Sequence, residues 1–415
     1  MILNYIWIAF FLVGFVVAFI KMLFGDTEIF STILTQMFDS AKLGFEIALG
    51  LTGIMAFWLG MMRVGEKGGV IKVFAKLVNP FFSKLFPDIP KDNDANGSII
   101  MNFSANMLGL DNAATPLGLK AMQDLQSINK DKAVASNAMI MFLVLNTAGI
   151  TLIPTSVIAI RQTMAIEQGL VGFNAADIFL PTLIGTFISF VSGMLAVAWF
   201  QKIKILQPAI LLFLLGFSGL MAALFFWLKQ FPADEMSTMI SLIGSVIIIS
   251  IIILFIFIGF INKINVYDCF VEGAKDGFKT SVTIIPYLIA ILVAIAVFRA
   301  SGCLDFIVDG IAYAVNAIGL DDRFVPTLPI GLMKTVSGSG ARGLMVDVMQ
   351  TYGVDSFQGK LASIIQGSTE TTFYVLAVYF GSVNIKETRY AVTCGLIADF
   401  VGLIGAILVG YLFFG

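Results

Sequence analysis

The chain has 415 residues, of which 58% are hydrophobic and only 13% charged, and its mean hydropathy is +0.95. This composition excludes a soluble globular domain and indicates an all-α, polytopic membrane protein. The net charge is −2 with no long basic or acidic run, so no nucleic-acid partner is expected.

Membrane spans are the first elements that the hydropathy pattern predicts. A helix of about 20 apolar residues crosses a hydrocarbon core of about 30 Å. The N-terminal run is predicted to be the first span and not a signal peptide, because it lacks a basic start and a small-residue cleavage site. Nine crossings are expected, near residues 4–24, 44–62, 133–160, 175–200, 207–228, 237–261, 280–298, 361–383 and 388–413.

Two of these runs contain polar interruptions that predict discontinuous helices. Backbone that leaves the helix at membrane depth is tolerated only where protein covers it or a watery cavity lies beside it. Residues 133–160 are interrupted by Asn146, Thr147, Gly149, Thr151 and Pro154, and residues 361–383 by Gln366, Gly367, Ser368, Thr369, Glu370, Thr371 and Thr372.

Two further stretches, 101–120 and 334–343, are too polar to lie in lipid, and each is expected to form a re-entrant helical hairpin. Such a hairpin consists of two half-helices of about 15–20 Å, too short to cross the bilayer. The first stretch carries Asn102, Ser104, Asn106, Asp111, Asn112 and Thr115, with Gly109, Pro116 and Gly118 to break the helix; the second carries Lys334, Ser337, Ser339 and Arg342.

An internal repeat connects these features. The segment from Asp39 to Phe45 matches the segment from Glu272 to Phe278, an offset of 233 residues, and the same offset places one polar stretch over the other. The predicted organisation is a first repeat at 1–206, a linker helix at 207–236 and a second repeat at 237–415. With re-entrant hairpins each repeat crosses four times, so a single linker span makes the second repeat inverted.

The distribution of Lys and Arg predicts the orientation. In this topology 16 of the 25 lie in loops on one side, which indicates the cytoplasmic face of an inner membrane, with the N-terminus cytoplasmic and the C-terminus outside. Lys21, Lys42, Arg161 and Lys229 argue the other way. The loops on the basic side are 63–95, 120–132, 201–206, 262–279 and 384–390.

The polar breaks are the candidate binding site, expected to lie together near the bilayer centre. Half-helix ends present free N–H groups or carbonyls that can hold a polar solute or a coupling Na⁺ or H⁺. The alternative for each Ser, Thr and Asn is interhelical packing. Lys334 and Arg342 either neutralise Glu370 or Asp347 or hold an anionic substrate. The candidate residues are Asn102, Ser104, Asn106, Asp111, Asn112, Thr115, Asn146, Thr147, Lys334, Ser337, Ser339, Arg342, Gln366, Ser368, Thr369 and Glu370.

Little in the sequence suggests enzymatic chemistry. Histidine is absent, which removes every His-containing metal site, and the three cysteines are too widely spaced for a zinc site or a disulfide framework. No nucleophile and base pair and no GxxxxGK[ST] loop is recognisable. We therefore expect neither an enzyme nor a nucleotide-driven motor, and no cofactor apart from a coupling ion.

Three stretches of the sequence resemble motifs of a known group. Residues 102–126, NFSANMLGLDNAATPLGLKAMQDLQ, resemble the spore maturation A proteins, whereas 326–353, PTLPIGLMKTVSGSGARGLMVDVMQTYG, and 364–383, IIQGSTETTFYVLAVYFGSV, resemble the spore maturation B proteins. The resemblance covers about residues 40–413. It implies two inverted "nucleoside recognition" or Gate domains, similar to parts of concentrative nucleoside transporters and of the ferrous iron transporter B membrane domain, but without the GTPase domain of the latter.

The leading hypothesis is a secondary transporter for a small polar solute, with a nucleoside or related metabolite as one candidate. The alternative is a non-transporting membrane protein of envelope or spore assembly. The lipid bilayer and the solute are the expected partners, and homo-oligomerisation is left open. A polar cavity between the breaks would favour transport, and fully packed, dry breaks would favour assembly.

Overall fold

The computed structural model describes residues 2–90, 92–109 and 111–415, and this part of the chain is helical with no β-strand. Seven of its helices are long and apolar enough to cross a membrane. They are α1 (Ile2–Leu23), α2 (Ile29–Gly68), α8 (Phe179–Gln201), α9 (Pro208–Leu228), α10 (Ala233–Ile261), α11 (Val266–Ala300) and α17 (Ala391–Phe414). The chain is therefore an all-α polytopic membrane protein, as predicted.

The other two predicted spans are divided into half-helices, which confirms that they are discontinuous. The first consists of α6 (Asn137–Thr147) and α7 (Thr155–Glu167), and the second of α15 (Phe357–Ser368) and α16 (Thr372–Ser382). Pro154 lies directly before α7, where it disfavours helical backbone in the preceding residue. Thr369 is extended, with φ −139° and ψ 167°, and ends α15.

Both polar stretches form helical hairpins. The first is α4 (Asp94–Met107) with α5 (Asp111–Ile128), and the second is α13 (Leu328–Val336) with α14 (Gly338–Tyr352). Helix α4 has 14 residues and α13 has nine, which at 1.5 Å per residue gives about 21 and 14 Å. The first helix of each hairpin is therefore too short to cross a hydrocarbon core of about 30 Å, and neither α5 nor α14 is among the seven long apolar helices, as re-entrant hairpins require.

The helices follow in the same order in both halves of the chain. Two spans (α1, α2; α10, α11) are followed by a shorter helix, α3 (Val70–Phe82) or α12 (Cys303–Ala317), then by the hairpin, the broken helix and the last span. Two short 3₁₀ turns, η1 (Ala175–Ile178) and η2 (Val325–Thr327), complete the elements. Helix α9 lies between the two series, where the linker helix is expected.

Contacts between equivalent helices show that the second repeat is inverted. Gly44 of α2 packs on Ile289 of α11, whereas Gly60, four turns later, packs on Phe270, so the two helices are antiparallel. In α8 and α17 the residues meet in the same antiparallel sense, for example Ser189 Oγ with the carbonyl of Ala398. A rotation that exchanges antiparallel helices has its axis perpendicular to them, in the membrane plane.

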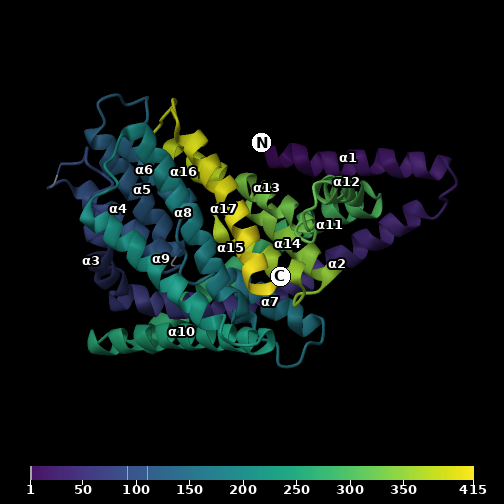
Figure 1. Cartoon of the computed structure of the whole chain (residues 1–415), viewed down its shortest axis with the longest axis horizontal. Coiled ribbons are helices and arrows are strands. Elements are labelled where there is room, and N and C mark those ends of the chain that lie inside the picture. The colour runs from purple at the N-terminus through teal and green to yellow at the C-terminus, as the bar shows by residue number, and fades with distance from the viewer. Residues whose placement is uncertain (1, 91, 110) are drawn as a thin grey trace.

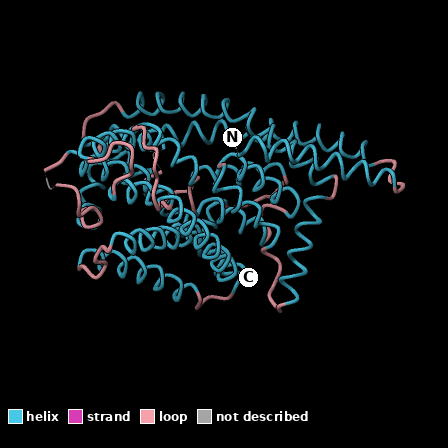
Figure 2. Tube along the Cα trace, turned by 90° about the horizontal axis from the view of Figure 1, so that it is seen from above, coloured by secondary structure: helices cyan, strands magenta, loops and turns pink. Residues whose placement is uncertain are grey.

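The first helix of each repeat packs on the second helix of the other. Helix α1 contacts α11, and α10 contacts α2. Figure 1 shows α1 and α10 on opposite sides of the molecule. The turned view in Figure 2 shows helices throughout, with the turn between α1 and α2 projecting farthest from the rest. Because the first helix of each repeat packs on the other repeat, the two repeats form one body.

Each broken helix is anchored at one end by an arginine that donates to the backbone of the other repeat. Arg161 of α7 is fully buried and donates to the carbonyl of Val354, to Ser363 Oγ and, at 2.8 Å, to Asp177. Arg389, just before α17, donates to the carbonyl of Ala135. Arg161 is therefore a buried helix residue and does not count as a loop charge in the positive-inside rule. One of the four residues that argued against the predicted orientation is thereby removed.

Candidate solute site at the crossing of the broken helices

The two broken helices meet directly at their interruptions. The backbone N–H of Glu370 donates to the carbonyl of Thr147 at 2.8 Å. The side chains of Asn146 and Thr147 donate to carbonyls of their own helix, those of Phe142 and Val144. One free carbonyl at the end of α6 and one free N–H before α16 therefore satisfy each other, which fixes the crossing of the two repeats.

The first hairpin is bound to this crossing by two hydrogen bonds. Asn106 Nδ2 donates to Asn146 Oδ1 at 2.6 Å, and the N–H of Leu152 donates to the carbonyl of Met107 at 2.8 Å. Gly109 follows with φ +72°, and a Cβ there would lie 3.2 Å from the carbonyl of Ile153. Only glycine combines that backbone conformation with so close an approach.

The second hairpin contacts the crossing from another side. Ser337 caps α14 by accepting from the N–H of Gly340 at 3.0 Å, and its hydroxyl lies 3.2 Å from that of Ser339. Gly338 packs against Thr371, where a Cβ would be 2.9 Å from the hydroxyl. Both hairpins contact the broken helices: α4 and α5 contact α6, and α13 contacts α15 and α16.

A cavity of about 180 Å³ lies at the crossing and brings four of the predicted residues together. Asn106 comes from the first hairpin, Asn146 from the first broken helix and Glu370 from the second. Two tyrosines of α16 add aromatic surface and hydroxyl groups. The lining residues are Asn106, Thr115, Asn146, Glu370, Tyr374, Val375, Val378 and Tyr379.

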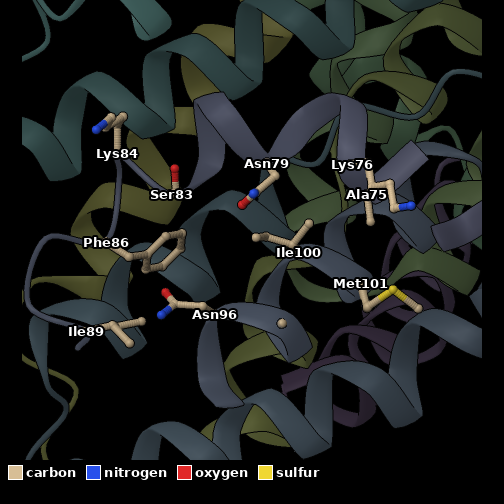
Figure 3. Close-up of a pocket in the computed structure, with 11 residues that line it drawn as sticks. Ala75, Lys76, Asn79, Ser83, Lys84, Phe86, Ile89, Asn96, Ile100 and Met101 are labelled. Atoms are coloured by element: carbon tan, nitrogen blue, oxygen red, sulfur yellow. The ribbon is translucent and has the colours of Figure 1, made fainter. Parts of the chain in front are cut away.

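A larger groove of about 580 Å³ lies elsewhere, between α3 and α4. Figure 3 shows polar side chains of α3 and the turn after it, among them Lys76, Asn79 and Lys84, on one side of this groove. Asn96 and Ile100 of α4 face them. The groove contains none of the predicted site residues, so its size alone does not make it the candidate site.

Ten of the other predicted residues do not line this cavity. Asn102, Ser104, Thr147, Gln366, Ser368 and Thr369 are buried, and Ser104 and Ser368 donate to carbonyls of their own helices, which is the packing role considered above. Lys334, Ser337, Ser339 and Arg342 belong to the second hairpin and are absent from the lining. The side chains of Asp111 and Asn112 lie outside the described part of the chain.

Neither suggested pairing of the charged residues is found. Asp347 is neutralised by Arg299 of α11, with contacts of 3.0 and 2.5 Å, and not by Lys334 or Arg342. Glu370 is exposed to the cavity and, among the described residues, forms no ion pair. The pairing of Arg299 with Asp347 was missed because the two residues are 48 positions apart in the sequence. From the sequence, only cations close to the breaks were considered as partners.

Sequence reasoning also missed Asp399, Tyr374 and Tyr379. Asp399 is 6% exposed and accepts a hydrogen bond of 2.7 Å from Thr372 at the start of α16. It is the only charged residue in α17, and that was the signal that could have identified it. The tyrosines gave no such signal, because aromatic residues are common throughout the chain.

Comparison with known proteins agrees with this architecture. The Gate family model, described as "Nucleoside recognition", matches residues 48–164 and 281–386. The chain belongs to the Gate family. The two matched segments begin 233 residues apart, the offset of the internal repeat.

Two relatives of this Gate protein, both from Bacillus subtilis (strain 168), confirm the resemblance. Spore maturation protein B is 46% identical over 181 residues, which cover 44% of this chain and 98% of the relative. Spore maturation protein A is 39% identical over 197 residues, which cover 48% of this chain and 94% of the relative. The Gate protein is thus similar to almost the whole of each.

Proposed function

We propose that this Gate protein is a secondary transporter that binds a small polar solute in the cavity at the crossing, with a nucleoside or related metabolite as the first class to test. The observation that supports it most directly is the position of this cavity. An assembly role would leave the breaks fully packed and dry. Glu370 is instead exposed at this cavity. Discontinuous helices of two inverted repeats are where transporters of this architecture bind their solutes.

The lining residues suit a compact solute that forms hydrogen bonds. The Asn106 and Asn146 amides and the Thr115 hydroxyl can donate or accept, and Glu370 accepts. The rings of Tyr374 and Tyr379 offer a surface for a flat group. A volume of about 180 Å³ is below the roughly 300–1,000 Å³ of pockets for drug-sized ligands, which favours a small solute in this conformation.

A thermal-shift screen of the purified protein tests the proposal. Nucleosides, nucleobases, amino acids, Na⁺ and divalent metals are added singly, and a ligand at 100 times its Kd should stabilise the native state by about 2.7 kcal/mol. Asn146→Ala should weaken the response to the active compound at least tenfold. Asn79→Ala, which alters the larger groove, is the matched control and should respond as the wild type does.

The alternative is a membrane protein of envelope or spore assembly that transports nothing. The names of the two relatives favour it. In that case no compound should shift the melting temperature, and Asn146→Ala should retain full function in a complementation assay. Transport would be refuted by that pair of results.

A further inference from the structure

We propose that Asp399 is a proton-binding site and that its protonation is linked to the solute cavity. Asp399 lies in the middle of α17, where every other residue is uncharged. Only 6% of its surface is exposed. The proton site rests on the surroundings of Asp399 alone, whereas its link to the cavity rests on the proposed function.

The face of α17 that carries Asp399 packs on the interruptions of both broken helices. Gly395, one turn before it, lies against Thr372 and Thr147, where a Cβ would be 2.8 Å from Thr372 and 3.7 Å from Thr147. Gly402, one turn after it, lies equally close to Ser189 and Thr369. Glycine at these positions lets α17 approach both breaks, so the carboxyl group lies at the crossing itself.

The Asp399 carboxyl group is only half satisfied. Oδ2 accepts a hydrogen bond of 2.7 Å from Thr372 Oγ1, whereas Oδ1 is buried and has no hydrogen-bond partner in the described part of the chain. No ion pair to Asp399 is found among the described residues. An ionised carboxylate in this setting costs at least a few kcal/mol, and protonation removes that cost.

The charged groups on neighbouring helices do not replace a proton. Lys334 of α13 lies within electrostatic range but forms no ion pair with Asp399, and Glu370 adds a second negative charge. Lys360 of α15 is held by Asp177 and Asp355. Helices α6 and α8 have no charged residue, and Cys394 and Tyr411 are the other titratable groups of α17. A site of three acidic or thiol side chains, of the kind that holds a transition metal, is not found in the described residues.

Thr372 connects the proton to the cavity. It is the first residue of α16, and the same half-helix supplies Tyr374, Val375, Val378 and Tyr379 to the cavity lining. When the carboxyl group loses its proton, the O–H bond breaks, the electron pair stays on Asp399 and the proton passes to solvent water. The hydrogen bond to Thr372 changes at the same time, so protonation and solute binding both act on α16.

Infrared difference spectroscopy of the purified full-length protein tests the proton site directly. The wild type at pH 7 should show the carbonyl stretch of a protonated buried carboxyl group, and the isosteric Asp399→Asn variant should lack it. Glu370→Gln, the matched control, should keep the band. An absent band in the wild type, or an unchanged band in Asp399→Asn, would overturn the proton site.

Proton exchange in weak buffer tests the link to the cavity, with a compound found by the thermal-shift screen as the probe. Binding to the wild type should change the number of bound protons, and binding to Asp399→Asn should change it at least tenfold less. An equal change in both proteins would overturn the link. If no compound binds at all, the proposed function fails while the infrared result still decides whether Asp399 holds a proton.

Discussion

Asp177 lies in the 3₁₀ turn η1 and Glu370 in the break before α16, and their surroundings give them different roles. The Asp177 side chain is 6% exposed and lies 2.8 Å from Arg161 and 3.6 Å from Lys360. Glu370 is exposed to a cavity and has no ion pair among the described residues. A buried carboxylate beside two cations has a structural role, whereas an exposed carboxylate at a break is available to a ligand.

Removal of Asp177 should destabilise the protein strongly. Asp177→Ala leaves the Arg161 guanidinium fully buried without its carboxylate, which should cost about 3–5 kcal/mol of unfolding free energy. Denaturant unfolding in detergent micelles measures this. Asp321→Ala is the matched control: it breaks the exposed pair with Arg323 and should cost at most about 1 kcal/mol. Equal losses would mean that the buried network does not hold α7 in place.

Glu370→Gln should leave the fold intact and impair binding. Because the carboxylate is exposed and unpaired, its neutral isostere should change the unfolding free energy by no more than about 0.5 kcal/mol. Thermal unfolding and the ligand screen on one preparation measure both effects. If the variant purifies normally and keeps full ion-dependent solute binding, Glu370 has no role in binding.

At the scale of helices, hydropathy and helix-breaking residues predicted most elements. The seven long spans, both broken helices and both hairpins fall where the apolar runs and polar interruptions indicated. Side-chain partners were harder to predict, because the pairing of Arg299 with Asp347 depends on how α11 packs on α14. Composition predicts which segments enter the membrane, but partners depend on the rotation of each helix about its axis.

The long contact between α2 and α11 depends on glycine. A Cβ on Gly277 would lie 2.5 Å from Ala56 Cα and 2.6 Å from the carbonyl of Met55, and the backbone cannot yield without moving the helix. Gly277→Ala should therefore cost about 1–3 kcal/mol. Gly53→Ala, where nothing lies within 4 Å, should cost nothing. Unfolding of the two variants in the same micelles compares them, and equal stability would contradict this packing.

At the scale of the whole molecule, the loops that carry the basic residues gather at one end. Asn137 Nδ2 donates to the Asp88 carboxylate at 3.1 Å, Gln201 donates to the carbonyl of Asn137, and the N–H of Ala135 donates to the carbonyl of Glu387. These contacts join three of the loops that the sequence placed on the cytoplasmic side, 63–95, 201–206 and 384–390, to the residues at the start of the first broken helix. The opposite end holds Arg161, Asp177 and the loop at Val354. The inverted architecture requires this separation, whereas only the charge rule predicts which end is cytoplasmic.

Cysteine labelling in intact cells tests that orientation. Lys84→Cys lies at the basic end and should react with an impermeant reagent only after the membrane is opened, whereas Val171→Cys, which is fully exposed between α7 and α8, should react from outside. Cys269 is first replaced by serine, because it is the native cysteine that is only partly buried. The two sites serve as controls for each other, since an inverted insertion exchanges their behaviour. Reaction of both from outside would contradict the re-entrant hairpins themselves, because α4 and α5 would then have to make one crossing of the bilayer together, which would bring residue 84 to the same side as residue 171.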